Sequence, residues 1–175
     1  MFYAMRATAF DSDAPAGDRR CIIRRDAADG KPELVELAWG FEPSEPGGRP
    51  FRFVRSEGRQ FPVNRCLVPA SEFHVARAGR RYRFRLEDGN WFYLAGIWRP
   101  ATPTWPEAYA VLTVPANPEV ARYQDRQGAI IRRNRHMQWL DLTVPEEDQL
   151  VTPPARSFTV EEIEKPAPAQ ASLAF

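Results

Sequence analysis

Residues 81–98 read RYRFRLEDGNWFYLAGIW, and this stretch indicates the fold class. Its first part, 81–86, alternates arginine with aromatic or aliphatic residues, the period-two pattern of a strand with one buried face. The arginines are therefore expected to share the outer face. An Asp-Gly-Asn turn at 88–90 leads into 91–98, which is apolar throughout and predicts a central strand.

Three further runs have the composition of strands: 21–25 (CIIRR), 33–39 (ELVELAW) and 108–114 (AYAVLTV). The first two are joined by AADG, whose Asp-Gly is a hairpin turn signal. Long helical periodicity is scarce. One helix is expected over 134–142, with Asn134 as its cap. The pattern predicts a mostly β domain with few short helices.

The chain has 175 residues, of which 43% are hydrophobic and 27% charged, so it can bury the core of one domain. No apolar run approaches the roughly 18 residues that a membrane span needs. The first residues lack the apolar core of a signal peptide, and a cytoplasmic location is expected. Residues 153–175 are rich in Pro and Ala and acidic, which predicts a partly disordered tail after a domain over 1–152.

Positive charge is concentrated in the middle of the chain. Residues 49–135 hold 16 basic and 7 acidic side chains, a net charge of +9, and the flanking segments are net negative. Of the 24 basic residues all but Lys31 and Lys165 are arginines, whose planar guanidinium binds phosphate through two hydrogen bonds. Two interpretations remain open at this point: a solvated arginine-rich surface and a phosphate-binding groove.

The sequence offers little for metal or cofactor chemistry. Cys21 and Cys66 lie in apolar, strand-like runs without CxxC spacing, and His74 and His136 are the only histidines. No glycine-rich phosphate loop is present. We therefore expect neither a metal nor a cofactor.

Four blocks over most of residues 20–141 resemble, in the correct order, the SOS response-associated peptidase (SRAP) family, whose members crosslink to abasic sites in single-stranded DNA. The most specific is RCLVPASEF at 65–73, which is close to the family's RCLVPA-x-x-F block. The others are Trp39-Gly40, FVRSEG at 53–58 and YQDRQGAIIRRNRHMQWLD at 123–141. The resemblance implies an α+β, predominantly β fold: a partly open β-barrel with a few short helices.

The catalytic positions that the resemblance identifies are substituted here. The family uses an N-terminal cysteine after the initiator methionine, where this chain has Phe2. The family's asparagine, glutamate and histidine fall on Phe53, Val75 and Gln124, and Glu72 would need a register shift to replace the glutamate. The α-amine of Met1 is the remaining candidate, because an unprotonated amine forms a reversible Schiff base with an aldehyde. Peptidase (hydrolase) and lyase chemistry is expected to be lost or altered.

The DNA-contacting positions of the family are retained. Arg55 and Arg126 match arginines that hold phosphates. The complete set comprises Trp39, Arg55, Glu57, Thr113, Asp125 and Arg126. Structural alternatives stay open for three of them: a core role for Trp39, a strand-ladder role for Thr113, and for Glu57 a surface ion pair with Arg55 or Arg59.

Two functions from different classes follow. The first is binding of single-stranded or abasic-site DNA, with crosslinking impaired and with a nucleoid-associated location in a bacterial cell. The second is a catalytically inactive homologue that acts as a protein-interaction or regulatory module, in which the acidic tail contacts an unidentified protein partner. Neither involves a membrane.

Overall fold

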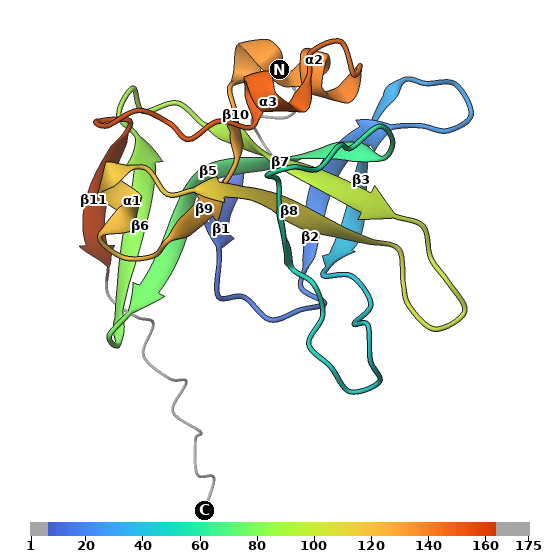
Figure 1. Ribbon diagram of the computed structural model, residues 1–175, viewed down its shortest axis with the longest axis horizontal. Helices are drawn as coiled ribbons and strands as arrows, with labels where there is room; N and C mark the ends of the chain where they lie inside the picture. The colour runs from blue at the N-terminus through green and yellow to red at the C-terminus, as the bar shows by residue number, and fades with distance from the viewer. Residues whose placement is uncertain (1–6, 164–175) are drawn as a thin grey trace, which may run out of the picture.

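The computed structural model describes residues 7–163 and shows an α+β, predominantly β fold, as the sequence predicted (Figure 1). Within these residues an 11-stranded mixed sheet is accompanied by three short helices. The strands are β1 (Thr8–Asp11), β2 (Arg19–Arg25), β3 (Pro32–Trp39), β4 (Phe53–Arg55), β5 (Arg65–Arg77), β6 (Arg80–Leu86), β7 (Phe92–Arg99), β8 (Ala108–Pro115), β9 (Arg126–Gly128), β10 (Ile130–Ile131) and β11 (Phe158–Ile163). The helices are α1 (Pro118–Ala121), α2 (His136–Leu140) and α3 (Glu146–Gln149). No helix in the described part of the chain is long and apolar enough to cross a membrane.

The long strand β5 organises the sheet. The strand order is β10-β7-β8-β3-β2-β5-β6-β11, and β5 also pairs with β7 and β1, so that the central strands curve into a partial ring (Figure 1). Along one edge β5 pairs with β7 over Arg65–Ala70 and then with β6 over Phe73–Arg77. On the other edge, Pro69 lies between the part of β5 that pairs with β2, up to Leu67, and the part that pairs with β1, from Ala70, where the N–H group that proline lacks disturbs neither ladder.

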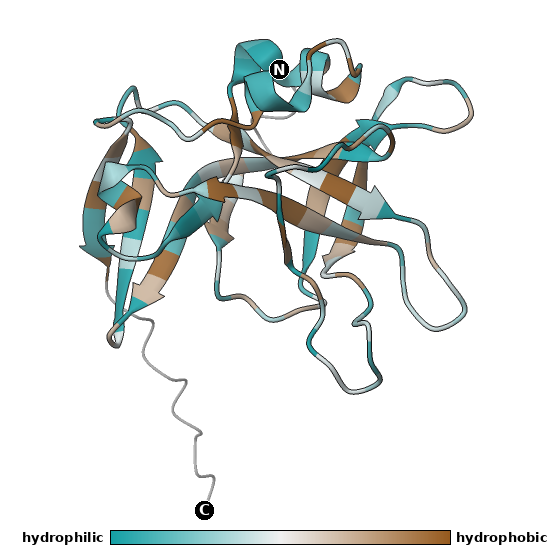
Figure 2. Cartoon of the chain, viewed as in Figure 1, coloured by the Kyte–Doolittle hydropathy of each residue, from teal (hydrophilic) through white to brown (hydrophobic). Residues whose placement is uncertain are grey.

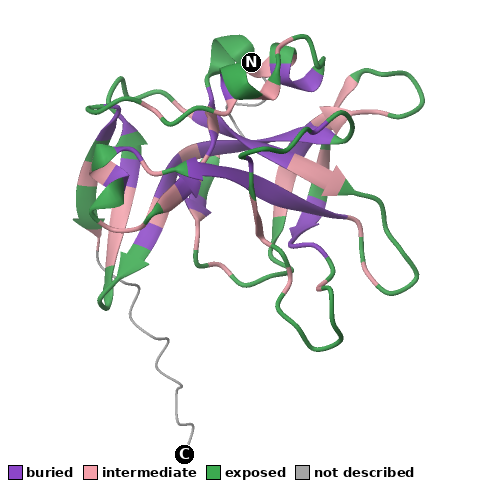
Figure 3. Ribbon diagram, viewed as in Figure 1, coloured by how far each residue is buried: buried purple, intermediate pink, exposed green. Residues whose placement is uncertain are grey.

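The core follows the central strands. β8 is buried along seven of its eight residues, in agreement with a sequence that is apolar apart from Thr113. Figure 2 shows the hydrophobic residues concentrated on β7 and β8, and Figure 3 shows the same strands buried and the hairpin tips exposed. Gly96 on β7 lies so close to its neighbours that a Cβ there would come within 2.8 Å of the Cys66 sulfur. Cys66 itself is completely buried.

The expected strands at 21–25, 33–39, 81–86, 91–98 and 108–114 are confirmed with small shifts at their ends. The helix expected over 134–142 is shorter, because residues 133–135 form a 3₁₀ turn and α2 begins only at His136. Asn134 therefore does not cap it. Residues 158–163, within the expected tail, form the edge strand β11 on β6. The rest of that tail, residues 164–175, lies outside the described residues.

Three arginines of β6 are engaged in ion pairs and do not form a free basic face. Arg81 faces Asp11 on β1 at 3.4 Å, and Arg83 pairs with Glu161 on β11. Arg85 lies 3.2 Å from Glu72 on β5. Neighbouring strands thus neutralise much of the positive charge that the sequence places on this element.

A buried ion pair attaches α2 and α3 to the sheet. The Arg65 guanidinium, with only 4% of its side chain exposed, lies 2.7 Å from a carboxylate oxygen of Glu146 and 4.2 Å from the centre of the Trp139 ring. It also donates to the carbonyl oxygens of Phe61 and Trp139. The same Glu146 oxygen accepts from the Phe61 N–H at 2.8 Å. Arg65, on β5, therefore links this strand to both α2 and α3.

This arrangement predicts a specific pH dependence of stability. The hydrogen bond from the Phe61 N–H, with that from Arg65, holds the pKa of Glu146 below its ordinary value, against the opposing effect of burial. A pKa lowered by folding contributes stability that is fully present above the unfolded pKa, about 4.3, and lost as the pH falls through the folded pKa. In urea unfolding from pH 6 to pH 3, the advantage of wild type over Glu146→Gln should shrink below about pH 4.3. A constant difference between the two proteins would contradict this role.

Candidate functional site

A pocket of about 480 Å³ collects residues from four separate parts of the chain. β4 pairs with β8 so that Arg55 lies beside Thr113, and β8 pairs with β9 so that Thr113 lies opposite Gly128. Because of this register, residues of the matched blocks 53–58 and 123–141 both lie against β8. Six of the predicted site residues consequently line the pocket: Phe53, Arg55, Thr113, Gln124, Asp125 and Arg126.

Arg126 is fixed in one wall of the pocket. Its Nε donates to the Thr113 hydroxyl at 3.0 Å and a terminal nitrogen donates to the Thr113 carbonyl at 2.8 Å. Another nitrogen lies 2.8 Å from the Glu57 carboxylate, and this hydrogen-bonded pair lowers the pKa of Glu57. Glu57 therefore pairs with Arg126 rather than with Arg55 or Arg59. The wall presents an oriented guanidinium whose charge is partly neutralised.

Arg55 is placed differently. It is exposed at the end of β4, and within residues 7–163 it forms no ion pair. Its guanidinium is consequently available to an anion from outside the protein.

Trp39 supports the pocket from beneath. Its ring is 1% exposed, and its Nε1 donates to the Arg52 carbonyl at 2.9 Å. It also packs edge-on against Phe53, with ring centroids 5.2 Å apart. Of the two roles considered for Trp39, the geometry matches the core role, because neither face of the indole is open to a nucleic-acid base. Trp39 holds β4 in place.

The position expected for the family's glutamate carries no carboxylate. Val75 is 2% exposed and faces the main core. Glu72 does not substitute for it, because residues 72 and 75 point to opposite faces of a strand whose register is fixed by the pair Val75↔Tyr82. The Glu72 carboxylate instead lies 2.5 Å from Nε2 of His74 on the outer face.

Five lining residues of this pocket were not among the predicted site residues: Ser12, Asp13, Arg52, Gln127 and Gly128. Two of them, Asp13 and Gln127, have polar side chains with notable partners. Asp13 follows β1, and its carboxylate accepts from the Ala76 N–H at 3.0 Å, next to Val75. Gln127 is 2% exposed; its carbonyl oxygen accepts from the Asn117 N–H, and its Nε2 has no hydrogen-bond partner within the described residues. Asp13 has no signal in the sequence, because only the fold brings it to β5. Gln127 lies inside a matched block, next to the predicted Arg126.

A second hollow of about 620 Å³ continues from the first across β4. Phe53 and Arg55 line both, so they form the ridge between them. The second hollow adds Arg59, Arg99 and Phe51, whose side chain is 44% exposed. We refer to the two hollows together as the β4 groove. Its lining contains five arginines (Arg52, Arg55, Arg59, Arg99 and Arg126) and three carboxylates (Asp13, Glu42 and Asp125).

The family model of the SOS response associated peptidase (SRAP) matches residues 10–166. The chain belongs to the SRAP family. This match covers every block on which the resemblance was based and all elements that build the β4 groove. No curated protein matches the chain.

Solved structures with this fold support the assignment of the architecture. A protein from Bordetella bronchiseptica superposes with a TM-score of 0.68 at 21% identity, covering 93% of each chain. A phage-related protein from the same organism gives 0.66 at 19% identity, covering 87% of this chain and 81% of the other. A protein from Bacteroides thetaiotaomicron gives 0.63 at 18% identity over 85% of this chain and 75% of its own. These similarities show the fold of this SRAP protein.

The remaining site expectations concern the N-terminus and metals. Met1 and Phe2 lie outside the described residues. Over residues 7–163 no group of three or more His, Cys, Asp or Glu side chains is arranged to hold a metal ion. The described lining of the β4 groove presents arginine, amide, hydroxyl and carboxylate groups.

Proposed function

We propose that this SRAP protein binds single-stranded DNA along the β4 groove and that the crosslinking and self-releasing peptidase chemistry implied by the family is impaired in it. The observation that carries the proposal is the exposed guanidinium of Arg55, which forms no ion pair within residues 7–163 and lies on the ridge between two adjoining hollows. A backbone that crosses this ridge would contact Arg55 at its centre.

The groove combines the two features that bind single strands without sequence preference: cationic side chains for the phosphates and an aromatic face for the bases. Arg59 and Arg99 lie on one side of the ridge and Arg126 on the other. Phe51 supplies an exposed ring in the same hollow as Arg59. Stacking of a base on such a ring contributes about 1–3 kcal/mol.

The described lining of the β4 groove offers neither of the groups that would form a durable adduct with an abasic site. A stable thiazolidine needs an amine and a thiol on one residue, and no thiol or lysine amine lines the β4 groove in the described part of the chain. Cys66 is a completely buried residue of β5, and burial raises the pKa of its thiol. The α-amine of Met1 would give only a Schiff base, in which amine and aldehyde condense to an imine with loss of water and water can reverse the step.

Incubation with single-stranded DNA that carries one abasic site tests both parts of the proposal. Half of the samples receive borohydride, and all are run on a denaturing gel beside a parallel native binding assay. We expect native binding and no covalent band without reductant. A band only with borohydride would assign a Schiff base, which acetylation of the α-amine should abolish. A covalent band without reductant would overturn the loss of crosslinking, and absence of native binding would overturn the DNA-binding proposal.

A further inference from the structure

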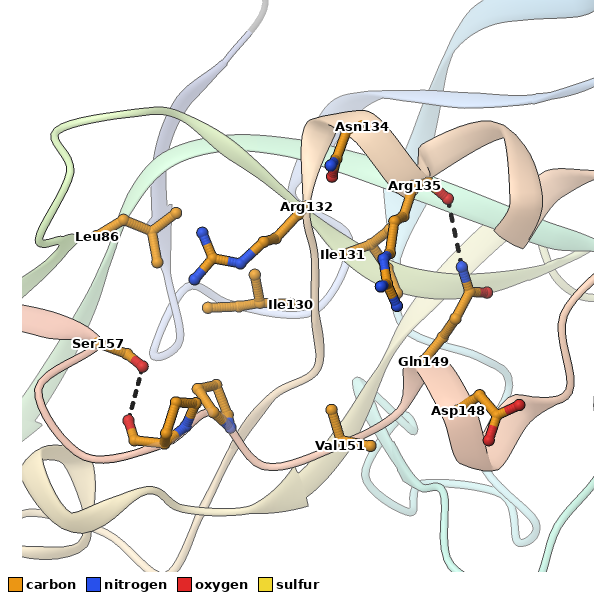
Figure 4. Close-up of a pocket in the computed structure, with 12 residues that line it drawn as sticks. Leu86, Ile130, Ile131, Arg132, Asn134, Arg135, Asp148, Gln149, Val151 and Ser157 are labelled. Carbon is orange, nitrogen blue, oxygen red and sulfur yellow. Dashed lines mark hydrogen bonds between the residues drawn. The ribbon is translucent and has the colours of Figure 1, made fainter.

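A separate cavity of about 310 Å³ lies between β10, the 3₁₀ turn 133–135, α3 and the segment 150–157 (Figure 4). It shares no lining residue with the β4 groove. Its walls include six apolar side chains: Leu86, Ile130, Ile131, Val151, Pro153 and Pro154. Apolar walls with a few polar groups are typical of small-molecule sites.

The wall formed by residues 150–157 is fixed in place by hydrogen bonds. The Thr152 hydroxyl donates to the Pro115 carbonyl at 2.7 Å, and the Asn117 side-chain amide donates to the Pro154 carbonyl at 3.2 Å. On the opposite side, the Gln149 amide donates to the Arg135 carbonyl at 3.3 Å. These contacts come from β8, α1 and α3, so the cavity does not depend on a ligand for its shape.

Two cationic groups extend among the apolar side chains. Figure 4 shows the Arg132 guanidinium directed towards Leu86 and the Arg135 guanidinium directed towards Gln149, both of which line the cavity. The Asp148 carboxylate points away from both arginines. Arg135 has no ion pair among residues 7–163. Arg132 faces Asp88 at 3.6 Å, with 57% and 47% of the two side chains exposed, so solvent weakens this pair. The cavity is therefore cationic as well as apolar.

We propose that this cavity binds a small organic anion, with an aliphatic or aromatic body against Leu86, Ile130 and Val151 and a carboxylate or sulfonate between Arg132 and Arg135. The apolar body gains from leaving water, and the anionic end receives charge-assisted hydrogen bonds from two guanidinium groups. A neutral molecule of the same shape uses only the first contribution. The site therefore selects for charge.

The fluorescent probe 8-anilinonaphthalene-1-sulfonate, an aromatic sulfonate, tests the proposal on the full chain. We expect saturable binding of one probe per chain, displaced by octanoate at least tenfold more effectively than by octanol. Arg132→Gln/Arg135→Gln should weaken the binding of both anions at least tenfold and leave octanol unchanged. Arg133→Gln, in the same turn but outside this cavity, is the matched control and should bind as wild type does.

Near-UV circular dichroism of every variant separates loss of the site from loss of the fold, because this probe also binds partly unfolded chains. A second variant, Val151→Glu, places a negative charge in the wall without altering either arginine and should also exclude octanoate. Equal binding of the probe by wild type and the double variant would overturn the proposal. Displacement by oligo(dT) but not by octanoate would overturn it too, since the cavity would then belong to a nucleic-acid surface.

Discussion

Replacing Arg65 with methionine is expected to lower the free energy of unfolding by about 3–5 kcal/mol, as is typical when one partner of a buried ion pair is removed. Arg65 donates to Glu146 and to two backbone carbonyls, and it stacks on Trp139. Methionine fills part of the volume but leaves these acceptors without a donor. Urea unfolding followed by tryptophan fluorescence measures the loss, because Trp139 is buried beside the substituted position.

Arg19→Met provides the control for this prediction. Arg19 pairs with Glu36 at 3.0 Å, but more than half of each side chain is exposed. Its loss should change the free energy of unfolding by no more than about 1 kcal/mol. If Arg65→Met also cost less than about 1 kcal/mol, the attachment of α2 and α3 to the sheet would not depend on this guanidinium.

Arg55→Gln/Arg59→Gln is expected to weaken binding of oligo(dT) roughly 100-fold at low salt, since each charged hydrogen bond contributes about 1.5–3 kcal/mol. The slope of log K against log [salt] should also become shallower by about 1.4, because each lost phosphate contact on a single strand removes about 0.7. Both arginines are exposed residues of the β4 groove. Fluorescence anisotropy with labelled oligo(dT) measures affinity and slope together.

Two variants control for net charge. Arg80→Gln/Arg133→Gln removes the same two charges outside the β4 groove and should change affinity by less than about threefold. Glu57→Gln should strengthen binding, because it releases Arg126 from its ion pair. If the Arg80/Arg133 variant lost as much affinity as the Arg55/Arg59 variant, net charge rather than the groove would explain binding.

For β5 the sequence indicated only a strand-like run around Cys66. The strands β2, β3, β6, β7 and β8 were predictable because period-two alternation and continuous apolar runs reflect burial directly. β11 was not, because its sequence FTVEEI is acidic and follows a proline-rich segment. Its place depends on the register with β6, in which Glu161 lies opposite Arg83. Complementarity of this kind becomes visible only when two strands distant in sequence are paired.

The candidate site, too, was predictable from the sequence only in part. The blocks that resemble the family identified Arg55 and Arg126, and the family's set of DNA-contacting positions added Thr113. The sheet brings all three to one pocket. The sequence left the role of Trp39 open, and its burial in the structure favours the core role. Asp13 and the cavity beside α3 arise from loops whose position is set by tertiary contacts, so no local pattern could have indicated them.

The most direct test of the DNA-binding account is the salt dependence of oligo(dT) binding by the wild-type protein. If the β4 groove binds DNA, measurable binding is expected at 50 mM salt and should fall steeply towards 300 mM, with a slope of log K against log [salt] of about −2 or steeper if at least three phosphates are neutralised. Binding that does not change over this range, or no binding at 50 mM salt, would contradict it.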